Sequence, residues 1–175
     1  MVLSVVTASL ALGACGSEGD PPTEEGARTG WRSTQTALSS VGVDVNASAQ
    51  WMASGMVDEN GASAMVTGVL PCPDGGSMEI DSSGEVTETR VFADLRIEFD
   101  GCEADGVVID GYLHQIGEVT ETKVSAEISG ELVWTGAAEG TCDIDLSADV
   151  TTDGASASGS FGGKMCGYGY DQLWG

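Results

Sequence analysis

The chain has 175 residues, of which 28 are acidic and six are basic, and its formal net charge is −22. So strong a negative charge repels other polyanions, which argues against nucleic acid as a partner. The length suits a single domain with a hydrophobic core. The acidic residues are spread along the chain rather than gathered in a tail, so we expect a folded domain with a charged surface.

The first segment has the features of an export signal. Residues 2–14 are mostly apolar and carry no charge. The run is too short for a stable membrane-spanning helix, which needs about 20 residues, and it is typical of the apolar part of a secretory signal. It ends in Leu12-Gly13-Ala14-Cys15. This sequence resembles the lipobox of bacterial lipoproteins, in which an aliphatic residue and two small residues precede a cysteine.

The resemblance implies a lipid anchor at Cys15 and a place in the cell envelope. It implies cleavage after Ala14, diacylglycerol on the Cys15 sulfur and a further acyl group, such as palmitate, on the new amine. Several acyl chains hold a protein firmly on a membrane. The next residue is Gly16 rather than Asp, which by the same resemblance favours the outer membrane. We read residues 15–30 as an acidic flexible tether and residues 31–175 as a single β-rich extracytoplasmic domain.

The remaining four cysteines agree with export. Cys72, Cys102, Cys142 and Cys166 are an even set in a chain that carries an export signal, which favours two disulfide bonds. The alternative is a zinc site, but the cysteines form no C-x-x-C pair and the chain has a single histidine.

Period-two alternation of apolar and polar residues predicts an all-β domain, an antiparallel meander of about eight strands. We expect a curved sheet or a small barrel, with one short helix near residues 31–39. Cys142 to Thr151 shows the pattern well, since its even positions are apolar and its odd positions polar. The expected strands lie near residues 41–57, 62–70, 77–82, 86–100, 107–116, 119–135, 141–151 and 155–166.

Two turn signals set the register of two hairpins. Asn60-Gly61 and Asp153-Gly154 are preferred two-residue hairpin turns. A two-residue turn at Asp153-Gly154 places Leu146 opposite Phe161. It also places Cys142 opposite Met165, one residue short of Cys166, and a bulge at 162–163 would correct this offset. In the meander all four cysteines gather at one end of the sheet, so Cys142 pairs with Cys166 and, by elimination, Cys72 with Cys102.

The sequence contains no recognised catalytic motif and predicts no cofactor. His114, the single histidine, shares one side of its strand with Tyr112, and we interpret it as structural. Glu131, Asp143, Asp145 and Asp149 could share one outer face of the sheet and are weak candidates for a calcium site. A solvated acidic face is the alternative that we prefer.

The end of the chain carries its densest aromatic cluster: Tyr168, Tyr170 and Trp174. These residues either pack against one end of the sheet or form a recognition patch. The leading hypothesis is therefore a non-enzymatic, membrane-anchored lipoprotein that acts by binding an envelope protein or by an envelope-structural role. The second is a carrier of a small apolar ligand within a curved sheet, and the third is an extracytoplasmic hydrolase.

Overall fold

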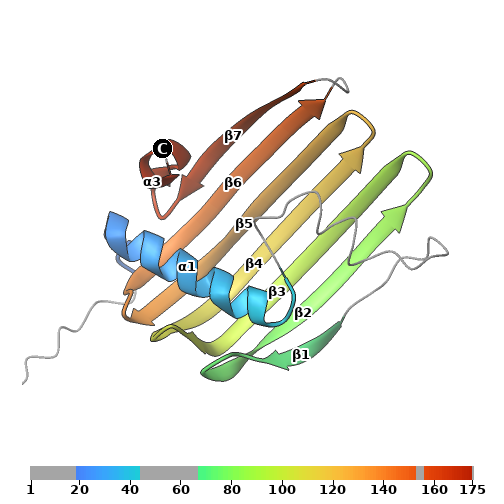
Figure 1. The fold of residues 1–175 in the computed structure, drawn as a ribbon. Coiled ribbons are helices and arrows are strands. Elements are labelled where there is room, and N and C mark those ends of the chain that lie inside the picture. The colour runs from blue at the N-terminus through green and yellow to red at the C-terminus, as the bar shows by residue number, and fades with distance from the viewer. Residues whose placement is uncertain (1–18, 44–66, 153–155, 175) are drawn as a thin grey trace, which may run out of the picture.

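The computed structural model describes residues 19–43, 67–152 and 156–174, which form one open antiparallel sheet and two helices (Figure 1). The strands lie in the sheet in chain order: β1 (Thr67–Pro71), β2 (Gly75–Val86), β3 (Arg90–Ala104), β4 (Val107–Thr120), β5 (Lys123–Gly136), β6 (Gly140–Thr152), β7 (Ala157–Met165) and β8 (Tyr168–Gly169). The all-β meander is confirmed. Since β1 and β8 occupy the two edges of the described sheet, it is open rather than a closed barrel.

Each long strand has one face toward the core and one toward solvent. Ile97 of β3 pairs with Leu113 of β4, and both are buried. The next residues along these strands, Glu98 and Tyr112, also pair and lie exposed on the opposite face. This arrangement follows from the alternation in the sequence, because successive side chains on a strand point to opposite faces.

Helix α1 (Glu24–Ser40) crosses one face of the sheet (Figure 1). It begins seven residues before Trp31, where the helix was expected to start, so residues 24–30 are helical rather than part of a flexible tether. Thr23 is the reason for the early start, because its side chain accepts a hydrogen bond from the Gly26 backbone N–H at 3.1 Å. Ala27, Thr34 and Leu38 are buried at helical spacing, so they form the face of α1 that packs on the sheet.

The hydrophobic core lies between α1 and the sheet. Its largest fully buried side chain is Trp134 of β5. Trp134 lies directly against Gly30 of α1, where only a residue without a side chain leaves room for the indole ring. The chain therefore brings the helix close to the sheet by combining its smallest residue with one of its largest.

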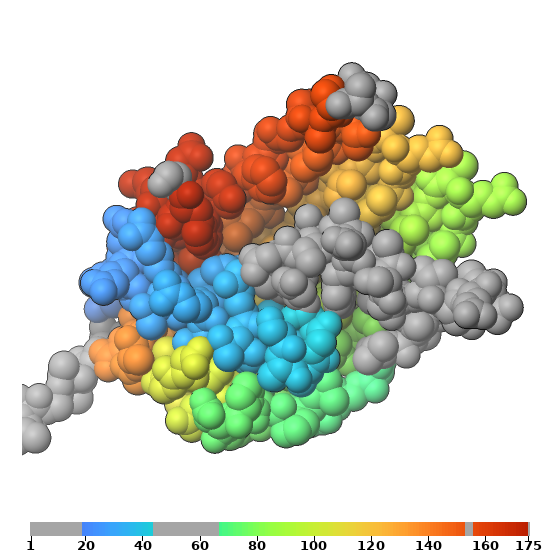
Figure 2. All heavy atoms as spheres, viewed as in Figure 1, coloured from blue at the N-terminus to red at the C-terminus, as the bar shows by residue number. Residues whose placement is uncertain are grey.

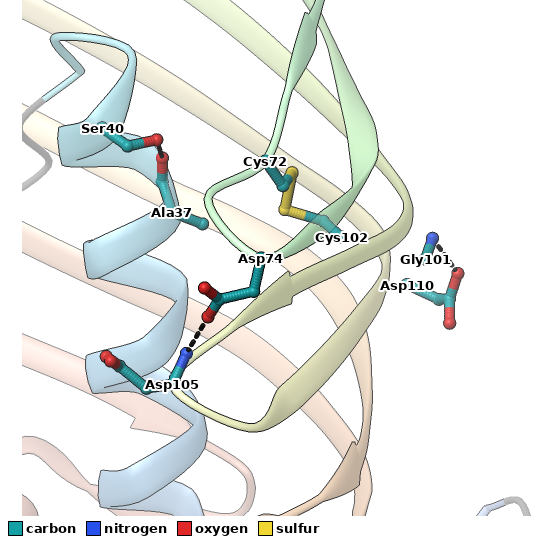
Figure 3. The surroundings of a disulfide bond; sticks show 8 residues. All are labelled: Ala37, Ser40, Cys72, Asp74, Gly101, Cys102, Asp105 and Asp110. Carbon is teal, nitrogen blue, oxygen red and sulfur yellow. Dashed lines mark hydrogen bonds between the residues drawn. A yellow bond between two sulfur atoms is a disulfide. The ribbon is translucent and has the colours of Figure 1, made fainter.

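Both disulfides form as predicted, Cys72–Cys102 and Cys142–Cys166. All four cysteines lie at the end of the sheet where β1, β3 and β7 finish and β6 begins. Figure 3 shows the first bridge beside the C-terminal turns of α1, near the Asp105 backbone N–H that donates to Asp74. The bridges thus connect the first, third, sixth and seventh strands at the end of the sheet that the helix covers.

The predicted register of the last hairpin is wrong by two residues. Leu146 pairs with Gly163, and Phe161 pairs with Ala148 instead. Thr152 pairs with Ala157, so four residues connect the strands rather than a two-residue turn. The predicted bulge is not needed, because Cys166 follows β7 with a left-handed backbone (φ 53°) and reaches Cys142 from there.

Other differences concern boundaries. The turn between β4 and β5 falls at residues 121–122, four residues later than the expected break at 117–118. Residue 41 caps α1 instead of starting a strand, and the rest of the expected 41–57 strand lies outside the described residues. The Asn60-Gly61 turn and most of the 62–70 strand lie outside them too. The short strand β8 and helix α3 (Tyr170–Trp174) were not expected.

Candidate functional site

A groove of about 200 Å³ lies on the face of the sheet that carries α1. Its floor comes from β4, β5, β6 and β7, and its walls come from α1 and α3. Most lining residues are apolar or aromatic: Trp31, Gln115, Ala126, Ile128, Leu146, Ser147, Ala148, Phe161, Tyr170 and Trp174. Figure 2 views this face and shows the N-terminal half of α1 beside the C-terminal segment.

Three aromatic rings form one wall of the groove. Phe161 and Tyr170 are stacked with ring centroids 5.6 Å apart, and the Tyr170 and Trp174 centroids are 5.1 Å apart. Phe161 and Trp174 remain 55% and 40% exposed. Large aromatic side chains left this open in a cluster are a feature of binding surfaces. The wall therefore offers stacked rings to a ligand.

The predicted aromatic patch is divided between two roles. Tyr170 and Trp174 belong to the groove, as the recognition alternative would require. Tyr168 instead serves packing, because it is half-buried against the core and its hydroxyl donates to the Pro22 carbonyl at 3.2 Å. This hydrogen bond joins the C-terminal segment to the residues just before α1.

Helix α3 is held in place by Arg28 of α1. The Arg28 guanidinium donates to the carbonyl oxygens of Leu173 and Gln172 at 3.0 and 2.8 Å. It also forms an ion pair with Glu24 at 2.7 Å. The last carbonyls of a helix lack intrahelical partners and carry partial negative charge, so a cation is favoured there. Arg28 thus fixes the wall that Tyr170 and Trp174 provide.

Small residues make the floor of the groove hollow. Ala126 of β5 and Ala148 of β6 are cross-strand neighbours, and Ala148 pairs on its other side with Phe161. On β4, the residue beside Ala126 is Gly117. This row has no side chain larger than a methyl group between β4 and β6, so space remains above the backbone.

Gln115 is the buried polar residue among those that line the groove, and its position is unusual. Its neighbours in the sheet are Leu95 and Ile128, so it interrupts an apolar row. The residue is only 4% exposed, and its Oε1 atom is shielded from water without a hydrogen-bond partner in the described structure. An unsatisfied buried acceptor costs about 1–3 kcal/mol. A ligand in the groove that carries a hydrogen-bond donor would remove this cost.

The opposite face of the sheet carries the predicted calcium candidates, which do not form one cluster. Glu131 and Asp143 are direct cross-strand neighbours, and Asp145 lies on the same face two residues further along β6. Asp149 lies further away and pairs with Lys123 at 2.7 Å. The described ranges contain no group of three or more His, Cys, Asp or Glu side chains arranged to hold a metal ion.

The Lys123–Asp149 pair has an electrostatic consequence. The hydrogen bond from the ammonium group to Asp149, together with the charge of that carboxylate, raises the pKa of Lys123 above its ordinary value of 10.5. The carboxylate favours the charged form of the lysine.

His114 also lies on this outer face, where its Nε2 is 2.8 Å from Asp94 Oδ1. Both side chains are roughly a quarter exposed. Tyr112 is near it, as the strand pattern predicted, and is 52% exposed. Within the described part of the chain, no Asp or Glu residue is buried.

Sequence reasoning missed Gln115 and Phe161 as site residues. The sequence could have indicated Gln115, because it follows Ile109 and Leu113 on the same inward-facing side of β4 and is polar. Phe161 received the wrong partner because the last hairpin was placed in the wrong register. Trp31 was expected in a helix, but its position at the groove depends on how α1 crosses the sheet.

Comparisons with known proteins found no matching family model, no matching curated protein and no matching solved structure. Neither described helix is both long enough and apolar enough to cross a membrane.

Proposed function

We propose that this protein is a lipid-anchored extracytoplasmic lipoprotein that binds a small apolar ligand in the groove between α1, α3 and the sheet. The lipobox residues Leu12-Gly13-Ala14-Cys15 and the two disulfides support the export and the anchor. The role is binding rather than catalysis. Of the functions considered from the sequence, carriage of an apolar ligand is the one that the groove favours.

The groove is the observation that carries this proposal. Ile128, Leu146 and Ala148 on its floor are only partly buried, although they point to the same side of the sheet as the core. Burying apolar surface stabilises a protein by about 25 cal/mol per Å². The apolar surface that the described residues leave partly exposed beside the core is therefore a favourable place for an apolar ligand.

The position of the proposed anchor adds support. The Thr141 backbone N–H donates to the Asp20 carbonyl at 2.9 Å, so the chain is fixed to the domain already at Asp20. Cys15 precedes Asp20 by five residues, and a chain of this length spans at most about 18 Å. An anchor at Cys15 would hold the groove close to the bilayer, where apolar molecules concentrate.

Native mass spectrometry of the membrane-extracted protein tests the proposal. We expect the wild-type chain to carry an additional small molecule that denaturation releases. Ala148→Phe fills the floor and should lose this molecule. Ser129→Phe, which adds the same ring on the exposed outer face of the neighbouring strand, should keep it. Equal release from both variants, or no released molecule with any form of the chain, would refute ligand carriage.

A further inference from the structure

We infer that the ligand is a neutral, ring-bearing small molecule that donates one hydrogen bond to Oε1 of Gln115. This inference rests on the proposed function, since it specifies the chemistry of the molecule that the groove binds. It depends on three properties of the site: the unpartnered amide oxygen, the aromatic wall and the lack of charge among the lining residues.

The hydrogen bond follows from the position of Gln115. Its side chain lines the groove, but its Oε1 has no partner in the described structure. The flanking residues Leu95 and Ile128 cannot supply a donor from their side chains. The last torsion of a glutamine side chain is soft, so rotation about it can turn Oε1 toward a ligand in the groove. A hydroxyl or N–H group on the ligand would then satisfy this acceptor.

The ring preference follows from the wall. Phe161 and Tyr170 are stacked with an interplanar angle of 15°, and Trp174 continues the cluster. Trp31 of α1 lines the groove as well. Aromatic rings gain from offset stacking and edge contacts with other rings beyond the area that they bury. Four aromatic residues among the ten that line the groove therefore select a flat ring over a flexible aliphatic chain.

Charge and size restrict the ligand further. No Asp, Glu, Lys, Arg or His is among the described residues that line the groove, so a charged ligand would be desolvated without a partner. Anions are also repelled by the net charge of −22. The volume of about 200 Å³ is below the roughly 300–1,000 Å³ of sites for drug-sized ligands. The ligand is thus about the size of one or two fused rings.

Calorimetric titration with two matched probes tests the inference. 2-Naphthol is neutral, bicyclic and has one hydroxyl donor, whereas 2-methoxynaphthalene has the same rings without the donor. The protein is the full chain carrying Cys15→Ser, so that no attached acyl chain competes for the groove. Gln115→Leu is the comparison variant, because it replaces the amide by an apolar side chain of similar size in an apolar row.

We expect the unmodified groove to bind 2-naphthol about tenfold more tightly than its methyl ether, the usual effect of one hydrogen bond to a buried acceptor. Gln115→Leu should bind both probes with nearly equal affinity. Both proteins are titrated with the same two probes, so any steric effect of the methyl group on binding enters both affinity ratios. A difference between the two ratios therefore isolates the hydrogen bond to Gln115.

The other outcomes separate the inference from the proposed function. Equal affinity of the unmodified groove for both probes would overturn the role of Gln115, while binding in the groove would stand. Tighter binding of 1-octanol than of 2-naphthol would overturn the ring preference. If neither naphthalene derivative nor 1-octanol binds, the proposed function fails together with the inference.

Discussion

Gly30 of α1 lies so close to the indole ring of Trp134 that a Cβ atom at residue 30 would overlap the ring. Trp134 is fully buried, so its ring is packed on all sides. The contact sets the distance between the helix and the sheet. The same contact therefore also affects the distance between Trp31, which lines the groove, and the strands of the groove floor.

Gly30→Ala should destabilise the fold, although alanine is the better helix former by about 1 kcal/mol. Overpacking in a core costs about 1–3 kcal/mol, and the better helix propensity offsets about 1 kcal/mol of it, so we expect the free energy of unfolding in urea denaturation to fall by up to about 2 kcal/mol. In a Trp134→Phe background the smaller ring leaves room, and the same change should become neutral or stabilising. An equal loss in both backgrounds would show that the Gly30–Trp134 contact is not the cause.

Arg28→Met should loosen the wall of the groove without unfolding the domain. The variant removes the two hydrogen bonds that hold the last carbonyls of α3. Because Arg28 is partly exposed, the loss of stability should be at most about 1 kcal/mol. Hydrogen exchange in residues 170–174 should accelerate, and Trp174 should become more accessible to acrylamide quenching. Arg32→Met, an exposed site one turn along α1, is the matched control and should change neither.

Each disulfide should contribute substantially to stability. The bridges span 30 and 24 residues, for which the chain-entropy estimate is about 3.5 kcal/mol each. Replacing both cysteines of either pair by alanine should therefore lower the free energy of unfolding by similar amounts. Peptide mapping without reduction should recover Cys72 with Cys102 and Cys142 with Cys166, and any other pairing would contradict the structure.

Reversing one negative charge on the acidic outer face should stabilise the fold. Glu131 and Asp143 lie directly opposite each other on neighbouring strands, where like charges are unfavourable. Glu131→Lys should create an attractive pair and raise the free energy of unfolding by about 0.5 kcal/mol, with a smaller gain at high salt. Thermal unfolding at low and high salt checks this. If Glu131→Lys instead lowers the stability, and added calcium stabilises the wild type but not the variant, a calcium site is indicated.

The sheet could be predicted from the sequence because the alternation of apolar and polar residues that defines each strand lies within a short stretch of chain. The alternation from Cys142 to Thr151 follows directly from one wet and one buried face. The start of α1 was misplaced because the composition of residues 16–30 is typical of a linker, and the single capping residue Thr23 outweighs that composition. The last register was wrong because the connection between Thr152 and Ala157 has four residues, which the Asp153-Gly154 pair does not indicate.

The groove could not be predicted, because it depends on residues that meet only in the folded chain. Trp31, Gln115 and Phe161 come from a helix and two strands that are not neighbours in the sheet. The Tyr170–Trp174 cluster was visible as a motif, but its place depends on the Arg28 contacts with α3. The sequence does show that Gln115 is a polar residue at an inward position. Only the structure shows that its Oε1 has no partner among the described residues, which is what makes it a candidate site residue.

Export and lipidation at Cys15 are tested most directly by the intact mass of the membrane-extracted protein, measured with and without reduction. We predict a polypeptide that begins at Cys15, heavier by its acyl groups and lighter by the hydrogens of two disulfides until it is reduced. An unlipidated chain with free thiols at Cys72, Cys102, Cys142 and Cys166 would contradict both the anchor and the exported location.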